Sequence, residues 1–193
     1  MEKLCMILML CSIVLAALPV SHGIGISKGP KAMKNWYRQL PRMKQKVTEL
    51  HFYLHDIVSG SNPTNIPIAM ANSSAQSPTY FGLLAAMDDV ITVGPSPDSE
   101  IVGRAQGLFG SASLGDIAYH MTFNFMFTSG KYNGSTLSVI GHNPFMNEFR
   151  ELPIVGGSGY FRLARGSALL DTLTFNSTSG DAVVEYNVMV AHY

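Results

Sequence analysis

The strongest constraint on the fold is the stretch IAYHMTFNFMF, residues 117–127. Apolar and aromatic residues occupy alternate positions from Ile117 to Phe127, whereas His120, Thr122 and Asn124 stand between them. Since successive side chains of a strand point to opposite faces, this period of two predicts a β-strand with one buried face and one polar face. A chain that contains such a segment is expected to build a sheet around it.

Other segments show the same alternation. Residues 48–57 place Leu50, Phe52, Leu54 and Asp56 on one face, and residues 182–193 end the chain with the same period. We expect further strands at residues 66–72, 81–88, 101–109, 135–141 and 161–173. Turn sequences rich in glycine, proline and serine separate these strands. About eight short strands predict an all-β fold, an antiparallel barrel or sandwich, and a closed barrel of that size can hold one small ligand.

The N-terminus has the pattern of a secretory signal. Lys3 precedes a continuous apolar run at residues 4–20, and the small residues that a signal peptidase favours follow at 21–23. We therefore expect residues 1–23 to be cleaved and the protein to be secreted, with an uncleaved anchor as the alternative. Cys5 and Cys11 both lie in this segment, so we expect a mature chain without a disulfide. Three glycosylation sequons fit the same route, at Asn72, Asn133 and Asn176.

Charge divides the remaining chain into a basic arm, residues 24–47, and a domain, residues 48–193. The arm contains seven basic residues and no acidic one: Lys28, Lys31, Lys34, Arg38, Arg42, Lys44 and Lys46. From Val47 onward there are five basic and twelve acidic residues, a formal charge of −7. The arm either binds an acidic cell-wall polysaccharide or is a solvated leader, and we favour the leader. With an acidic domain in a secreted chain, we expect neither nucleic acid nor a membrane as a partner.

Two polar residues lie in phase with apolar ones and are candidates for chemistry. Asp56 shares a face with Leu54, and desolvation there would raise the pKa of its carboxyl group and suit it to acid–base work. Its alternative role is to begin the turn after the strand. Arg165 lies in phase with Phe161 and Leu169, so it points to an apolar side and needs a carboxylate or an anionic ligand. No motif for a metal or a cofactor is recognisable in the sequence, so we expect neither.

Several blocks resemble the plant dirigent proteins: FYLHDI at 52–57, MDDVIT at 87–92, VGRAQG at 102–107, FTSGKYNGSTLSVIG at 127–141, FRELPIVGGSGYFRLARG at 149–166 and GDAVVEYNVMVAHY at 180–193. The resemblance implies an eight-stranded antiparallel β-barrel, commonly a homotrimer, with a dimer as the alternative, secreted to the apoplast. Members of this family lack an oxidising centre. A separate oxidase, a laccase or a peroxidase, makes phenoxy radicals from a small phenolic substrate, and the dirigent protein imposes one handedness on their coupling.

The resemblance also implies a site. Its catalytic residues are Asp56, Arg150 and Arg165, and its substrate-binding residues are Asp88, Asn143 and Phe109. Asn143 stands where lignan-forming members have an aspartate, and the cysteine pair of those members has no counterpart in the mature chain. These differences make the sequence more similar to the disulfide-free branch, which includes pterocarpan synthase, an isoflavanol dehydratase.

Three functions follow as hypotheses. The first is a guide of phenoxy-radical coupling in lignan-type biosynthesis, which acts only together with an oxidase. The second, close behind, is a carbon–oxygen lyase of the pterocarpan synthase kind, which needs no oxidant. The third is a cell-wall structural or defence protein that uses the basic arm and merely retains the site.

Overall fold

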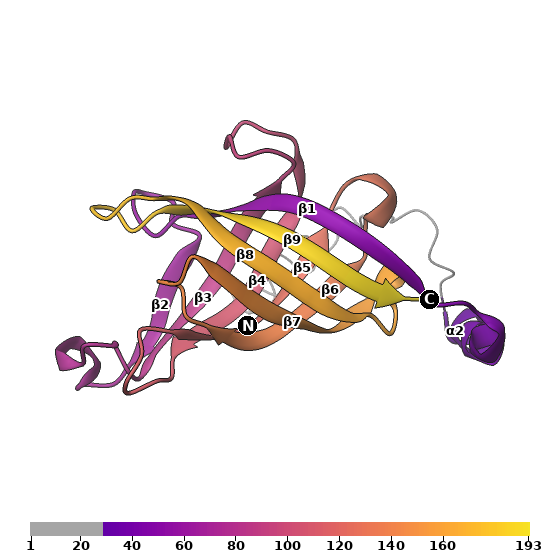
Figure 1. The fold of residues 1–193 in the computed structure, drawn as a ribbon, viewed down its shortest axis with the longest axis horizontal. Helices are drawn as coiled ribbons and strands as arrows, with labels where there is room; N and C mark the ends of the chain where they lie inside the picture. Colours follow the sequence, from indigo (N-terminus) through magenta and orange to yellow (C-terminus); the bar gives the residue numbers. More distant parts are fainter. Residues whose placement is uncertain (1–28) are drawn as a thin grey trace, which may run out of the picture.

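The computed structural model describes residues 29–193, so the expected signal segment with its two cysteines lies outside the described residues. The described chain starts with helix α2 (Pro30–Gln39) and the 3₁₀ turn η1 (Leu40–Arg42), and nine strands follow (Figure 1). The strands are β1 (Lys46–Asp56), β2 (Asn65–Met70), β3 (Leu83–Thr92), β4 (Ile101–Ser111), β5 (Tyr119–Phe127), β6 (Thr136–Asn143), β7 (Phe149–Ser158), β8 (Arg165–Phe175) and β9 (Ala182–His192). Short 3₁₀ turns lie between some of them: η2 (Ser74–Gln76), η3 (Gly130–Tyr132) and η4 (Gly159–Phe161).

The strands form one antiparallel sheet that closes into a barrel. Their order is β1-β9-β8-β7-β6-β5-β4-β3-β2, and β1 pairs in addition with β3. This closing contact is short and consists of Tyr53↔Thr92, Leu54↔Ile91 and His55↔Val90. It completes a ring of eight strands and leaves β2 as a ninth strand, which pairs with the first half of β3. The eight-stranded antiparallel barrel expected from the sequence is therefore confirmed.

Alternation along the strands gives the barrel its core. In β5 the apolar face is the inner one, because Met121, Phe123, Phe125 and Phe127 are buried and the residues between them are exposed. Phe52 of β1 packs edge-on against Phe125 across the interior, with ring centroids 4.8 Å apart. Burying one such side chain contributes roughly 1.5–3 kcal/mol, so a register slip of one residue would be strongly unfavourable.

One strand of the ring, β7, was not among the strands expected from the sequence. The expected set of eight included residues 66–72, most of which form β2 outside the ring, and lacked residues 149–158. Pro153 and the glycines at 156 and 157 weaken the strand pattern of this segment, because proline lacks an N–H and glycine has no side chain to pack. Its pairing with β8, from Phe149 to Ile154, nevertheless builds it into the barrel.

The two ends of the barrel differ in chemistry. At the end where β1 starts and β9 finishes, a cluster of rings packs together: Phe127, Tyr132, Tyr160, Phe161 and His192. At the other end, where β1 finishes and β5 starts, polar side chains lie on the inner face. We call these the aromatic end and the polar end.

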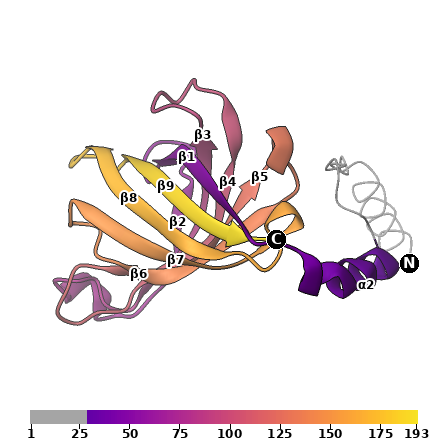
Figure 2. The same cartoon turned by 45° about the vertical axis from the view of Figure 1, so that its right-hand side comes forward.

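Part of the basic arm forms a helix that the sequence pattern did not predict. Helix α2 starts with Pro30, whose fixed φ suits the first turn of a helix. The helix lies beyond the aromatic end, near the C-terminus (Figure 2), where the Arg162 guanidinium lies 4.6 Å from the centre of the Trp36 ring. Among residues 29–193, no helix has the length and apolar character needed to cross a membrane.

Candidate active site

Two aspartates meet at the seam where the barrel closes. The pairing of β1 with β3 stops at His55↔Val90, and the next inner residues along the two strands are Asp56 and Asp89. No ladder pair joins them. Instead, Asn65 at the start of β2 brings its amide between the two carboxyl groups, because β2 begins beside β3 at Asn65↔Met87.

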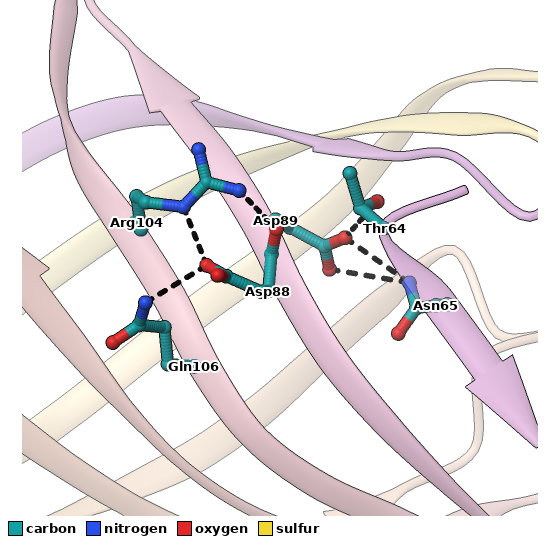
Figure 3. Close-up of polar contacts among 6 residues, drawn as sticks. All are labelled: Thr64, Asn65, Asp88, Asp89, Arg104 and Gln106. Carbon is teal, nitrogen blue, oxygen red and sulfur yellow. Dashed lines mark hydrogen bonds and ion pairs between the residues drawn. The ribbon is translucent and has the colours of Figure 1, made fainter. Parts of the chain in front are cut away.

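Hydrogen bonds hold this carboxyl pair in place. Asn65 Nδ2 donates to Asp56 Oδ1 at 2.5 Å. It also donates to Asp89 Oδ1 and Oδ2 at 3.1 and 3.3 Å (Figure 3). The hydroxyl group of Thr64 donates to Asp89 Oδ1 at 2.5 Å. Asn65 Oδ1 is buried and has no hydrogen-bond partner within residues 29–193. A buried acceptor of this kind points to a donor supplied from outside the chain, by a ligand or by water.

Burial changes the acidity of both aspartates. Asp89 is only 1% exposed. Burial, followed by the nearby charge of Asp56, raises the pKa of Asp89 from 3.8 to about 7, against the opposing hydrogen bonds from Thr64 and Asn65. Burial likewise raises the pKa of Asp56 to about 6, and the Asn65 hydrogen bond again opposes the shift. Two acids with such values hold about one proton between them near neutral pH, so the pair contains both an acid and a base.

Arg150 supplies the positive charge of the site. It lies in β7 in phase with the buried residues Leu152 and Ile154, and it is 5% exposed. Its Nη1 donates to the Phe145 carbonyl at 2.9 Å. Its Nε and Nη2 are buried and have no partner in the described part of the chain. Burial lowers the pKa of Arg150, and the neighbouring Tyr186 opposes that shift. A buried guanidinium with two unpartnered nitrogen atoms is ready to donate to an oxygen atom of a ligand.

Aromatic rings and one amide complete the polar end. The Tyr119 ring lies between Phe145, stacked at 4.6 Å between ring centroids, and Phe109, tilted at 4.8 Å. Asn143 pairs with Tyr119 across β5 and β6, and its buried Oδ1 has no partner among residues 29–193. Burial and the charge of Asp56 raise the pKa of Tyr119, so these rings lie within electrostatic reach of the carboxyl pair. The structure thus gathers Phe109 and Asn143 near Asp56.

Tyr186 links the carboxyl pair to the arginine. It belongs to β9 and is buried, and it pairs with Phe52 of β1 and with Leu170 of β8. Burial raises the pKa of Tyr186, and the charge of Arg150 opposes this shift while Asp89 and Asp56 reinforce it. Charges from three strands therefore act on one phenol group, which keeps its proton.

Two residues predicted for the site lie elsewhere. Asp88 points to the outer face of β3, where it accepts hydrogen bonds from Arg104 Nε at 2.5 Å and from Gln106 Nε2 at 3.0 Å (Figure 3). Arg165 is exposed at the start of β8. The inner residues of β8 are Ala168 and Leu170, so the opposite parity places Arg165 outside. These two assignments are corrected: Asp89 takes the place given to Asp88, and Arg150 is the arginine that reaches the interior.

Four residues of the polar end were not predicted: Thr64, Asn65, Tyr119 and Tyr186. Tyr119 and Tyr186 lie in recognisable alternating strands, and their parity alone was enough to place them inside. Asn65 is the last residue of the turn sequence SGSNPTN and carries no pattern of its own. The pairing of β2 with β3 brings it to Asp89, 24 positions away along the chain, and the closure of β1 on β3 brings Asp56 to the same amide.

The chain matches known proteins over most of its length. A family model described as "Dirigent-like protein" covers residues 47–191. Dirigent protein 21 of Arabidopsis thaliana is 53% identical over 147 residues, which are 76% of this chain and 78% of that protein.

This chain belongs to the dirigent family. Its relatives include pterocarpan synthase 1 of Glycine max, which is 46% identical to this dirigent protein over 151 residues, 78% of this chain and 81% of that one. The solved structure of the pterocarpan synthase dirigent protein GePTS1 superposes with a TM-score of 0.74 at 45% identity, and covers 78% of this chain and 87% of that one. The barrel described above is therefore the dirigent barrel.

Proposed function

We propose that this dirigent protein is a lyase of the pterocarpan synthase type, which removes water from a hydroxylated isoflavan by way of a quinone methide and needs no oxidant. The observation that carries the proposal is the buried Asp56–Asp89 pair, in which one acid and one base coexist near neutral pH. Relatives named pterocarpan synthase, at 45–46% identity, support the same reaction class.

In the first step, protonated Asp89 gives its proton to the benzylic hydroxyl of the substrate. The C–O bond breaks with its electron pair on the oxygen, and water leaves. The carboxylate of Asp56 takes the proton of the phenol group conjugated with that carbon, so the ring becomes a neutral quinone methide. In the second step, another phenol oxygen of the substrate attacks the methide carbon and forms the new ring. Its proton returns to Asp89, and Asp56 returns its own proton to the first oxygen.

Arg150 stabilises the charge that develops during these steps. The phenol oxygen gains negative charge as it loses its proton, and the two unpartnered nitrogens of Arg150, Nε and Nη2, can donate to it. Holding the substrate against the stacked Tyr119 and Phe145 rings exposes one face of the methide carbon to attack. One-sided attack sets a single configuration at this carbon, and selection of one substrate enantiomer by the site then gives a single pterocarpan enantiomer. The net reaction is the loss of one water and is redox-neutral.

A second function is favoured by Arg150 and the aromatic rings: guidance of phenoxy-radical coupling in lignan-type biosynthesis. Radicals formed by a separate laccase or peroxidase would lie against the Tyr119–Phe145 stack. The carbonyl oxygens of the coupled bis-quinone methide gain negative charge as its rings close, and Arg150 would stabilise that charge. This function needs an oxidant for every turnover, whereas the dehydration does not.

The deciding experiment incubates the purified protein with a racemic hydroxylated isoflavan in the absence of oxidant. The products are then separated by chiral chromatography. Formation of one pterocarpan enantiomer, abolished by Asp89→Asn and retained by Asp88→Asn, would establish the lyase. The alternative outcome is no turnover in this assay, together with an enantiomeric excess of the coupling product when a monolignol and a laccase are supplied. That outcome would show that the site guides radical coupling instead.

A further inference from the structure

Nine cations gather at the aromatic end of the barrel. Six belong to the arm and the first residue of β1, and three belong to turns and a strand start of the barrel itself: Lys31, Lys34, Arg38, Arg42, Lys44, Lys46, Lys131, Arg162 and Arg165. None of the nine forms an ion pair with a carboxylate within residues 29–193. Acidic groups do lie near this end: Glu49 of β1, and Glu151 of β7, which accepts a hydrogen bond from Ser167 two residues beyond Arg165. The result is a strongly positive pole on a domain whose formal charge is −7 from Val47 onward.

Contacts between the elements tie helix α2 and two turns of the barrel together at this end. The guanidinium of Arg162, in the turn before β8, stacks on Trp36 of α2. Lys131 lies 4.7 Å from the centre of the Tyr132 ring, and Tyr132 packs edge-on against Tyr160 at 5.0 Å between ring centroids. We call the nine cations, together with the exposed rings of Tyr37 and Tyr160, the basic pole.

The orientation of α2 decides what the basic pole presents to solvent. At 3.6 residues per turn, Lys31, Lys34 and Arg38 all lie about 140–160° around the helix axis from Trp36. Since Trp36 faces Arg162 on the barrel, the three cations face away from it, and all three are exposed. A helix that lies on a membrane turns its apolar side outward to the lipid. Here the tryptophan is turned toward the barrel, so the exposed side is the charged one.

We propose that the basic pole is a binding site for an acidic polysaccharide, a polyuronate, and that the arm and the barrel form it jointly. A polyuronate offers a carboxylate on each sugar to a row of cations, and its sugar rings offer flat C–H faces to aromatic rings. The basic pole has both elements, because Tyr37 and Tyr160 are 46% and 40% exposed among the cations. It lies at the opposite end of the barrel from Asp56 and Asp89, so a bound polymer would leave the polar end open. The proposal does not depend on the reaction catalysed there.

The test measures the binding of the purified full chain to polygalacturonate by biolayer interferometry, at several salt concentrations. An arm variant carries Lys31→Gln, Lys34→Gln and Arg38→Gln, and a barrel variant carries Lys131→Gln, Arg162→Gln and Arg165→Gln. Each is expected to weaken binding roughly tenfold at low salt and to flatten its salt dependence, since each removes three exposed ion pairs. Methyl-esterified polygalacturonate should bind weakly to all forms, because esterification removes the charge.

A matched pair of single substitutions separates the basic pole from charge in general. Arg165→Gln and Arg104→Gln each remove one arginine from the outer face of a strand, but Arg104 belongs to the ion pair with Asp88. Arg165→Gln should weaken binding and Arg104→Gln should not. Equal effects of the two would overturn the proposal. So would an arm variant that loses all binding while the barrel variant loses none, or binding of phosphatidylserine vesicles as tight as that of polygalacturonate.

Discussion

Asp88 and Asp89 are neighbours in the chain and lie on opposite faces of β3. Asp88 pairs with Arg104 and Gln106 on the outside, whereas Asp89 is buried against Thr64 and Asn65 at the seam of the barrel. Because a strand alternates its side chains, one of the two had to point inward, and only the inner one joins Asp56. The two residues therefore form a pair of matched positions, one reactive and one inert, for testing the site.

Asp89→Asn is expected to reduce the rate of dehydration by a factor of about 100 or more, because the amide cannot give a proton to the leaving hydroxyl. Asp88→Asn is expected to leave the rate unchanged, although it breaks the ion pair with Arg104. Single-turnover kinetics on both variants give the comparison. Equal losses would mean that the carboxyl group acts through the fold and not through the chemistry.

The pH dependence of kcat/KM should be bell-shaped with a narrow optimum. As the pH falls through about 6, Asp56 gains a proton and no longer serves as a base. As the pH rises through about 7, Asp89 loses its proton and no longer serves as an acid. Rates measured between roughly pH 4.5 and 9 would report the apparent pKa values of the pair. A rate that stays constant across this range would exclude the acid–base role.

The burial that raises the pKa of Asp89 should also make the folded protein less stable as the pH rises. The folded state holds the proton of Asp89 up to about pH 7, whereas the unfolded chain releases it near the ordinary value of 3.8. The free energy of unfolding therefore falls as the pH rises between these values. Asp89→Asn removes the buried charge and should raise the Tm at pH 8 but not at pH 4. The corresponding gain in the free energy of unfolding at pH 8 is up to about 4 kcal/mol. A stabilisation of equal size at both pH values would contradict this origin.

Asn65 is expected to act as a positioning residue for the carboxyl pair. Its amide donates to both Asp56 and Asp89, and these bonds lower the pKa of each carboxyl group. Asn65→Leu should therefore raise both values and move the whole pH profile upward by about one unit. Asn62→Leu, at an exposed asparagine of the same turn, is the control and should leave the profile in place. A lower rate with an unmoved profile would indicate a structural role alone.

Arg150 and Arg165 provide a second matched pair. Arg150→Met should reduce the rate by about 100-fold or more through loss of charge stabilisation. It should leave the Tm unchanged or raised, because it removes a buried charge that has no carboxylate partner within the described chain. Arg165→Met, on the outer face, should affect neither quantity. Calorimetry and steady-state kinetics on the two variants test this, and a loss of activity in Arg165→Met would restore that residue to the site.

The sequence determined the fold class and part of the inner surface. Alternation in residues 117–127 and 48–57 is a local property, since every second residue of a strand faces the same side. That property correctly placed Phe123 and Phe125 of β5, and Asp56 of β1, on the inner face. The same logic failed for Arg165, because Phe161 does not belong to β8. The 3₁₀ turn η4 and Leu163, with a φ of 59°, interrupt the strand, so the parity of Phe161 does not extend to residue 165.

The tertiary structure decided which polar groups meet. β3 is apolar on both faces from Leu83 to Met87, so its pattern did not show whether Asp88 or Asp89 points inward. Packing of the core decides between them. Met87 and Ile91 are buried inside the barrel, and Asp89 lies on the same face of β3 because it is two residues from each. Asn65 reaches Asp89 because β2 pairs with β3, and it reaches Asp56 only because β1 closes on β3 beside it. Strand parity depends on neighbours in the sequence, whereas the raised pKa values of Asp56 and Asp89 depend on burial and on neighbours that only the folded barrel brings together.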